Sequence, residues 1–338
     1  RARSMIVPAL IGAIATATIA WFATAAVLRL LERREILDIP NQRSSHIQPT
    51  PRGGGIAIIF SIALAWIVGW LLGFIPGGWW PVLVAMLALA LVSWVDDVRS
   101  LPVWLRLLSH IVAVAAALSL LADEQLVFQG LLPPWLDRIA AGIAMLWFIN
   151  LYNFMDGIDG ITSMETIAIG SGLFGAALFA GWNHPVAMLA LVVAAATAGF
   201  APWNWNPARI FAGDVGSVGI GYLLGWLLLV TAAVAGLWFV ALILPLYYLA
   251  DATTTLLRRA LRGERIWEAH ANHFYQRAAR RLNSHAKVSY TIAETNAWLV
   301  IAAIASVTII EPWLTLIFSS SIVSVLLWYF SGKDATTE

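Results

Sequence analysis

The feature that most constrains this chain is a succession of long apolar segments that fills most of its length. A helix that crosses the hydrocarbon core of a bilayer needs about 20 mostly apolar residues, and by that measure the sequence predicts about 11 membrane-spanning helices. Helices satisfy their own backbone hydrogen bonds in hydrocarbon, so the expected fold is an all-α polytopic membrane protein. The expected spans are residues 5–30, 54–75, 79–95, 103–122, 138–153, 163–181, 185–201, 216–234, 237–257, 289–310 and 312–330.

Composition supports this interpretation. The 338 residues are 60% hydrophobic and 12% charged, whereas soluble domains carry about 25% charged residues. We therefore expect one integral-membrane domain over residues 5–338, with 258–288 as its only long loop. The four residues before Met5 are expected to be a cloning remnant, and the first apolar segment is too long for a signal peptide. The absence of cysteine excludes disulfides and thiolate chemistry.

The basic residues predict an orientation, because Lys and Arg accumulate in cytoplasmic loops. When the connections are taken alternately, one set holds only Arg138, apart from the first four residues. The other set holds Arg29, Arg33, Arg34, Arg43, Arg52, Arg99, Arg106, Arg209, the run from Arg258 to Lys287, and Lys333. This bias predicts that the N-terminus is outside, the C-terminus is cytoplasmic and every concentrated polar cluster lies on the cytoplasmic face.

The richest polar cluster directly follows the fifth apolar segment. Asn150, Asn153, Asp156 and Asp159 lie within ten residues of one another and are interrupted by glycines. Such groups are costly in hydrocarbon and usually mark function. Their oxygens suit a hard divalent cation, and glycines let the backbone approach phosphate closely. The stretch therefore predicts the floor of a metal-dependent site that handles phosphate.

Three other clusters are expected to join it. Asp96 and Asp97 end the third span, where adjacent carboxylates repel each other unless a cation or a basic partner is near. Asp214 lies among glycines at the start of the eighth span. The segment 38–55 is basic and ends in three glycines, so its backbone N–H groups and Arg52 are predicted to hold phosphate. An ordinary flexible loop is the alternative for that segment.

The fifth cluster is the loop 258–288. Part of it is expected to lie as a basic helix along anionic headgroups. His270 and His273 are three residues apart and would share a helix face. Because imidazole suits zinc better than magnesium, phosphate contact or a structural role is favoured over metal binding for this pair.

With these residues assembled, the chain resembles the polyprenyl-phosphate N-acetylhexosamine-1-phosphate transferases, the MraY-like glycosyltransferase family 4. The resemblance extends over nearly the whole chain, and its details are most similar to the WbpL-type branch that initiates O-antigen synthesis. It is carried by Asp38-x-Pro40-Asn41-x-Arg43-Ser44-x-His46 with Pro51-x-Gly53-Gly54, by Asp96-Asp97, by Asn150-x-x-Asn153-x-x-Asp156-Gly157-x-Asp159-Gly160, and by Phe211-x-Gly213-Asp214-x-Gly216-Ser217.

The resemblance implies a reaction at the bacterial inner membrane. An N-acetylated amino-sugar-1-phosphate would pass from a UDP-sugar to undecaprenyl phosphate with release of UMP, as the first membrane step of O-antigen or surface polysaccharide synthesis. Mg²⁺ is the implied cofactor, with Mn²⁺ as an alternative. The implied partners are the UDP-amino sugar, undecaprenyl phosphate and the lipid bilayer, with a homodimer as one option and no nucleic acid.

The resemblance also implies roles by position. Asn153 and Asp214 match metal ligands, and Asp96, Asp97 and Asp156 match catalytic positions. Asp159, Asn204 and Phe211 match nucleotide contacts. The residues implied for phosphate, sugar or lipid phosphate are His46, Arg52, Arg106, Arg258, Arg259, Arg265, His270 and His273. The family commonly has adjacent histidines in its last long loop, and the separation of His270 from His273 leaves their roles open.

Several alternatives stay open. Direct attack of the lipid phosphate on the β-phosphorus is preferred to a two-step route through an aspartyl-phosphate. Asp96 is expected to position substrate rather than act as a base, because a phosphate with a second pKa near 6 is mostly dianionic at neutral pH. An initiating transferase for another envelope polymer, specific for UDP-N-acetylglucosamine, is the first alternative function. An ion-coupled transporter is the second, but its nearest candidate carboxylates, Asp251 and Glu294, are expected close to the inner ends of their helices.

The sugar is open as well. The 6-deoxy amino sugars N-acetylfucosamine and N-acetylquinovosamine are expected first, and N-acetylglucosamine or N-acetylgalactosamine next.

Overall fold

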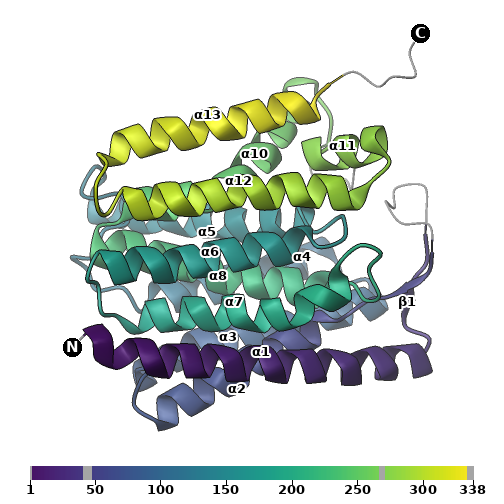
Figure 1. The fold of residues 1–338 in the computed structure, drawn as a ribbon, viewed down its shortest axis with the longest axis horizontal. Coiled ribbons are helices and arrows are strands. Elements are labelled where there is room, and N and C mark those ends of the chain that lie inside the picture. The colour runs from purple at the N-terminus through teal and green to yellow at the C-terminus, as the bar shows by residue number, and fades with distance from the viewer. Residues whose placement is uncertain (1, 41–47, 266–270, 333–338) are drawn as a thin grey trace.

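The computed structural model describes residues 2–40, 48–265 and 271–332. Long helices lie side by side in a bundle, and a two-stranded antiparallel ribbon projects from one end (Figure 1). The ribbon pairs β1 (Leu37–Asp38) with β2 (Thr50–Pro51). The helices are α1 (Ala2–Arg33), α2 (Gly55–Leu71), the 3-10 turn η1 (Gly77–Trp79), α3 (Trp80–Arg99), α4 (Val103–Leu118), α5 (Pro134–Phe154), α6 (Ile161–Phe179), α7 (Pro185–Asn204), α8 (Gly213–Ala235), α9 (Trp238–Ile243), α10 (Leu246–Leu261), α11 (Phe274–Leu282), α12 (His285–Ala305) and α13 (Pro312–Phe330).

The all-α fold class is confirmed. Every predicted span coincides with a helix, although the ninth is divided into α9 and α10 just before and after Pro245. Proline lacks the N–H that a continuous helix needs, and its ring clashes with the preceding turn. Among the described residues, seven helices are long and apolar enough to cross a membrane, and α2 and α4 are shorter apolar helices.

The centre of the bundle is α8, whose residues are nearly all buried. It packs against α2, α3 and α5. Its glycines permit this, as small residues do between membrane helices. A Cβ on Gly55 of α2 would overlap the backbone nitrogen of Gly216, and a Cβ on Gly221 would lie 2.9 Å from Cβ of Tyr152. These close approaches fix the start of α2 and the end of α5 relative to the start of α8.

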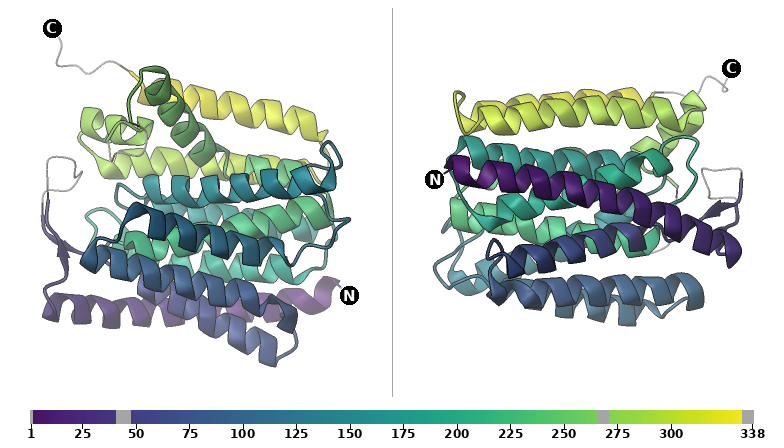
Figure 2. Two further views of the ribbon diagram at one scale, coloured as in Figure 1. Left: turned by 180° about the vertical axis from the view of Figure 1, so that it is seen from behind. Right: turned by 60° about the horizontal axis from the view of Figure 1, so that its bottom comes forward.

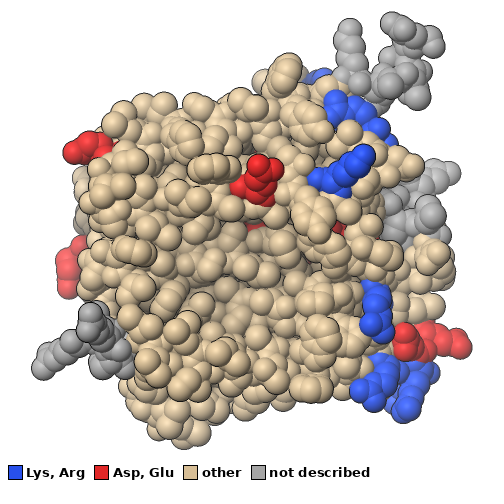
Figure 3. All heavy atoms as spheres, in the orientation of Figure 1, with Lys and Arg blue, Asp and Glu red and all other residues tan. Residues whose placement is uncertain are grey.

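The two ends of the bundle differ in charge. In Figure 3 the visible Lys and Arg side chains gather at the end where Figure 1 shows β1 and α11. Figure 2 shows the ribbon and α11 at this same end from behind. Helix α1 begins at the opposite end, and α13 finishes at the basic end. We refer to the basic end as the inner end; its cytoplasmic orientation stays a prediction.

Candidate active site

A polar cavity of about 280 Å³ opens at the inner end of the bundle. It brings together residues from three of the four sequence motifs, and α11 adds one more. The lining residues are Asp38, Arg52, Asn153, Asp156, Gly157, Ile158, Asp159, Asn204, Phe211, Ala212, Gly213, Asp214 and Gln276.

The glycine-rich segment before α2 joins the motif that precedes α8. Gly53 N and Gly54 N donate to Phe211 O at 3.2 and 2.8 Å, and Gly55 N donates to Ala212 O at 2.8 Å. The prediction that these amides hold phosphate is therefore wrong, because each already has a backbone acceptor. The glycines are needed for close approach instead: a Cβ on Gly54 would lie 2.6 Å from the Phe200 ring.

This backbone pairing places Arg52 between two acids from different helices. Its Nη2 lies 2.6 Å from Asp214 Oδ1 and 3.1 Å from Asp97 Oδ1. Burial alone would lower the pKa of Arg52, but the charges of Asp214, Asp97 and Asp38 outweigh it and raise that pKa above its ordinary value. Arg52 thus links three of the motifs through charge.

The second oxygen of Asp97 has a different environment. Oδ2 is buried without a hydrogen-bond partner, and a Cβ on Gly213 would lie 3.4 Å from it. A buried acceptor without a partner is costly, by about 1–3 kcal/mol and more for a charged group. Such an atom beside Asp214 suits a site that a cation or a substrate completes.

Asp96 is held separately from Asp97. Its Oδ2 accepts from Arg106 Nη1 at 2.9 Å and its Oδ1 accepts from Leu101 N at 2.6 Å. Neither Asp96 nor Arg106 lines the cavity. Each of the adjacent carboxylates therefore has its own basic partner, as their mutual repulsion predicts.

Asn153 and Asp214 line the cavity together. Asn153 Oδ1 accepts from Ser217 Oγ at 2.7 Å, and Ser217 lies three residues after Asp214 on α8. No three His, Asp or Glu side chains within the described ranges are arranged to hold a metal ion. One carboxylate and one amide still fit Mg²⁺, which usually binds one or two protein carboxylates and takes its other ligands from water and substrate phosphates.

Asp156 lies in the loop between α5 and α6 and lines the same cavity. Burial raises the pKa of Asp156 to about 6, although a hydrogen bond with Thr162 and the charge of Arg52 act in the opposite direction. At neutral pH such a carboxyl is still mostly ionised, and a nearby cation would favour its charged form further. Its position is consistent with the predicted catalytic role, which stays a prediction.

Asp159 is extensively hydrogen-bonded within the protein. Its Oδ2 accepts from Asn206 Nδ2 at 2.7 Å and from Ala208 N at 3.1 Å, and its Oδ1 lies 3.3 Å from His285 Nδ1. Burial alone would raise the pKa of Asp159, but hydrogen bonds with His285 and Asn206 outweigh it and lower that pKa. Asp159 therefore connects α12 to the loop that follows α7.

Asn204 has a similar bridging arrangement. Its Oδ1 accepts from Gly160 N at 3.1 Å and from Ser163 Oγ at 3.2 Å, while its Nδ2 donates to Ile210 O at 3.0 Å. With Phe211 beside it, it forms one wall of the cavity. Contact with a nucleotide at Asp159, Asn204 and Phe211 stays a prediction, but all three lie at the cavity.

The predicted phosphate contacts of the last long loop lie elsewhere. Arg258, Arg259, Arg265 and His273 do not line the cavity. Arg259 Nε donates to Glu264 Oε2 at 2.7 Å, and the Arg258 guanidinium lies 4.9 Å from the centre of the Phe274 ring. Their contact with substrate stays a prediction.

The histidine predictions have different outcomes. His273 is buried and caps α11 instead of lying on a helix face, so the expected shared face is wrong. The predicted basic helix does form, as α11, because Phe274, Tyr275, Ala278 and Ala279 bury one side of it. His46 and His270 lie outside the described residues.

Two residues of the site were not identified from the sequence. Gln276 lines the cavity from α11, and His285 contacts Asp159 from the first turn of α12. Both contacts join segments more than 100 residues apart, so no local pattern could have indicated them.

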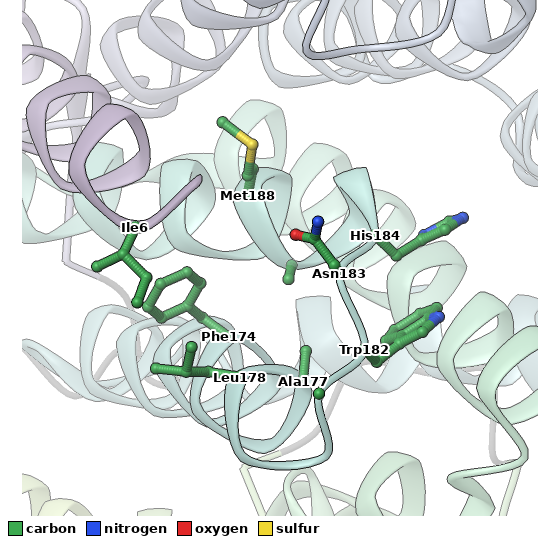
Figure 4. A pocket seen from close by; sticks show the side chains of 10 residues that line it. Ile6, Phe174, Ala177, Leu178, Trp182, Asn183, His184 and Met188 are labelled. Carbon is green, nitrogen blue, oxygen red and sulfur yellow. The ribbon is translucent and has the colours of Figure 1, made fainter. Parts of the chain in front are cut away.

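A second cavity lies at the opposite end of the bundle (Figure 4). Its volume is about 30 Å³, and the apolar side chains of Phe174, Leu178 and Met188 line it. His184 stacks on Trp182 nearby, with ring centres 4.7 Å apart. A space of this size holds no nucleotide sugar. A larger groove of about 500 Å³ between α12 and α13 is lined mainly by apolar surface, so the polar inner cavity is the candidate active site.

Fold and site together define a helical multi-pass membrane protein with an acidic cavity bridged by an arginine at one end. Residues 79–232 match the family model described as Glycosyl transferase family 4, and the family resemblance indicated by the motifs is confirmed over those residues. The match includes Asp96, Asp97 and Asp214, but it excludes Arg52 and α11.

Relatives agree with this assignment. The chain is 31% identical over 241 residues to the decaprenyl-phosphate N-acetylglucosaminephosphotransferase of Mycolicibacterium smegmatis, covering 64% of this chain and 58% of the relative. It is 30% identical to the phospho-N-acetylmuramoyl-pentapeptide-transferase of Lactiplantibacillus plantarum, over 51% of this chain and 58% of the relative. It is 25% identical to a probable undecaprenyl-phosphate N-acetylglucosaminyl 1-phosphate transferase of Bacillus subtilis, covering 75% and 72%.

The chain spans less than two thirds of the length of the first two of these relatives. Membership of the WbpL-type branch stays a prediction.

Proposed function

We propose that this protein transfers an N-acetylated amino-sugar-1-phosphate from a UDP-sugar to undecaprenyl phosphate and releases UMP. The observation that carries the proposal is the position of Arg52, which lies between Asp97 and Asp214 in a cavity that also contains Asn153. The names of the relatives, all transferases and two of them naming a polyprenyl phosphate, support the same reaction class.

The donor is proposed to bind in the inner cavity. Phe211, Asp159 and Asn204 all line this cavity, and we propose that the Phe211 ring stacks on the base while Asp159 and Asn204 contact its edge. Arg52 would steady the diphosphate, because a guanidinium donates to phosphate oxygens in a fixed, two-pronged geometry. The cavity and the Arg52 guanidinium together suit a UDP-sugar, whose uracil ring is neutral and whose diphosphate is anionic.

Asn153 and Asp214 would hold Mg²⁺, with Mn²⁺ as the alternative. The unpartnered Oδ2 of Asp97 lies near Gly213, the residue before Asp214. When bound, the ion offsets negative charge on the diphosphate and on the departing UMP. Arg52 would then exchange part of its ion pair with Asp214 for contact with the diphosphate.

The acceptor is proposed to enter from the bilayer along α4. Its helix surface is apolar and exposed at Leu107, Leu108 and Ile111, and Arg106 lies on the same helix, paired with Asp96. A phosphate oxygen of the acceptor bonds to the β-phosphorus of the donor. The bond from that phosphorus to the bridging oxygen breaks, and UMP leaves with the oxygen and its electron pair.

No proton has to be removed in this direct transfer, so Asp96 acts by holding Arg106 in position. An Asp97 that carries the sugar-phosphate would signal the two-step route: its Oδ2, which has no hydrogen-bond partner, would bond to the β-phosphorus while UMP leaves and the sugar stays on that phosphorus. Mass spectrometry of peptides containing Asp97, quenched during turnover, decides between the routes. Unmodified peptide throughout turnover is expected from direct transfer.

The transporter alternative gains little from the structure. Asp251 is fully buried and hydrogen-bonded to α10 and α11. Glu294 lies midway along α12, not near its inner end as expected, and it lines a groove with α13 on the bundle surface. The difference arises because α12 begins at His285, four residues before the expected span 289–310. A lone carboxylate on the outer surface provides no ion path between two halves of a bundle.

The test uses purified protein with Mg²⁺, undecaprenyl phosphate and a panel of UDP-amino sugars. We expect UMP release and a sugar-diphospho-lipid of matching mass with at least one donor. Asp214→Asn is expected to abolish both products, whereas Asp123→Asn, which changes an exposed acid outside the cavity, is the matched control. No UMP release with any UDP-sugar, from protein that remains folded, would refute the proposal.

A further inference from the structure

The carboxylate of Asp251 is the most heavily hydrogen-bonded acid outside the cavity lining, among the described residues. The side chain is fully buried in α10. It accepts hydrogen bonds from Tyr247 Oη (3.2 Å), Thr255 Oγ1 (3.3 Å), Phe274 N (3.0 Å) and Tyr275 N (3.1 Å), and it lies 3.2 Å from His273 Nδ1.

These bonds fix α11. Phe274 N and Tyr275 N are the first amides of that helix, which have no acceptor within it. A carboxylate at a helix N-terminus also interacts favourably with the helix dipole. A buried acid is tolerable only when several donors surround it, so Asp251 and the start of α11 depend on each other.

Helix α11 in turn packs against the loop that carries Asp156. Tyr275 Oη donates to Phe154 O at 3.0 Å, at the carboxyl end of α5. A Cβ on Gly157 would overlap Tyr275 Oη and would lie 3.2 Å from Gln276 Nε2. The first turn of α11 and the Asp156–Gly157 turn are therefore in direct contact.

Gln276 is the residue that α11 contributes to the cavity. Its Oε1 accepts from His273 N at 3.2 Å, which fixes the side chain. Asn153 and Asn204, the other two carboxamides at the cavity, likewise use their oxygens within the protein, so Gln276 would contact a ligand through its amide nitrogen. A neutral amide on a wall that is otherwise rich in charge suits hydroxyl or acetamido groups rather than phosphate.

We propose that Gln276 contacts the sugar of the donor and helps to determine which sugar is accepted, and that Asp251 is the positioning residue that holds Gln276 there through α11. This rests on the proposed function, because a sugar nucleotide must occupy the inner cavity.

Gln276→Ala tests the sugar contact by binding rather than by turnover. Dissociation constants are measured by calorimetry for UDP and for a panel of UDP-amino sugars. Loss of one neutral hydrogen bond is expected to raise the dissociation constants of the UDP-amino sugars by roughly threefold to tenfold. The differences in affinity among these sugars should become smaller. Binding of UDP, which lacks the sugar, stays unchanged. The matched control is Gln129→Ala, which removes an amide bonded to Ala232 O, outside the cavity.

The outcomes separate the two claims. If Gln276→Ala weakens the binding of UDP and of UDP-sugars equally, or changes the binding of neither, the proposed sugar contact is wrong and the proposed function stands. If wild-type protein binds neither UDP nor any UDP-sugar, the proposed function is wrong and the sugar contact is refuted with it.

Asp251→Asn tests the positioning role, with hydrogen exchange as a readout that needs no ligand. The amides of Phe274 and Tyr275 are expected to exchange at least tenfold faster, because the amide side chain offers one acceptor oxygen where the carboxylate offers two. The preference among UDP-amino sugars should change as it does in Gln276→Ala. The double variant, with Gln276→Ala and Asp251→Asn together, should show little further change.

Glu165→Gln provides the matched control for that experiment. Glu165 is a buried acid of α6 that accepts from Asn296 Nδ2 at 2.7 Å. Its substitution should leave the α11 amides and the sugar preference unchanged. Unchanged exchange at Phe274 and Tyr275 in Asp251→Asn, or fully additive effects on sugar preference, would refute the positioning role.

Discussion

At the scale of single residues, one arginine compensates two acids that would otherwise repel each other. Asp97 and Asp214 come from α3 and α8, and Arg52 lies between them at 3.1 and 2.6 Å. The Arg52 side chain is 37% exposed, so solvent weakens the ion pairs as a source of stability. The larger effect of Arg52 is on the electrostatic potential of the cavity, because its positive charge reduces the repulsion between the two acids and an anionic substrate.

Arg52→Ala is therefore expected to lower turnover by roughly 100-fold or more, as removal of a transition-state donor does, while stability falls by only about 1 kcal/mol. Arg52→Lys should recover part of the rate, because it restores the charge without the two-pronged geometry. UMP release and thermal unfolding measure the two effects. A loss of stability large enough to explain the lost rate would contradict a role in substrate binding.

Asp156 gives a prediction about pH. Its folded pKa of about 6 lies above the ordinary value of 3.8, so the folded protein holds this proton more tightly than the unfolded chain does. The stabilisation is complete below pH 4 or so and is lost as the pH rises through about 6. One pKa unit corresponds to about 1.4 kcal/mol, so the pH-dependent stabilisation from Asp156 amounts to at most about 3 kcal/mol.

Asp156→Asn is thus expected to stabilise the metal-free protein by about 3 kcal/mol at pH 7.5 and by only about 1 kcal/mol at pH 4.5, while turnover falls. Thermal unfolding in EDTA at the two pH values measures this. Equal effects at both pH values would show that the Asp156 proton is not coupled to folding.

At the scale of elements, the sequence predicted where the helices lie but misassigned the role of the segment before α2. Apolar length identified each span, and Pro245 divides α9 from α10 for a reason that was visible in the sequence. The three glycines before α2 were interpreted as a phosphate cradle. Their amides bond Phe211 and Ala212 instead, and a partner more than 150 residues away leaves no trace in local spacing.

Gly55 offers a direct test of that revised role. A methyl group there would overlap the backbone of Gly216, which no side-chain rotation can relieve. Gly55→Ala is expected to cost about 3 kcal/mol, at the upper end for overpacking, and to displace Arg52 from the cavity. Gly78→Ala is the control, because its Cβ would meet nothing within 4 Å. Thermal unfolding of the two variants measures the difference, and equal stabilities would contradict the close approach of α2 to α8.

At the scale of the whole molecule, the convergence of distant motifs could be predicted only in part. The sequence predicted that Asn153 and Asp214 share a site, because every polar cluster fell on one face of the bundle. It did not predict the positions of Gln276 and His285, or the hydrogen bonds between Asp251 and the first amides of α11, since each depends on how α10, α11 and α12 pack. The alternation of basic and non-basic loops predicts on which side of the membrane a polar cluster lies, but it does not predict which residues of that side contact one another.

That side of the membrane can itself be tested, and the lack of cysteine makes the test clean. Asn183 lies in the exposed turn between α6 and α7, whereas Glu264 is exposed after α10 at the inner end. In intact cells, a membrane-impermeant maleimide is expected to label Asn183→Cys at once and Glu264→Cys only after permeabilisation. Basic loops are retained on the cytoplasmic side, so the active-site cavity would then face the compartment that contains nucleotide sugars. The reverse labelling pattern would place the cavity outside and remove its access to a UDP-sugar.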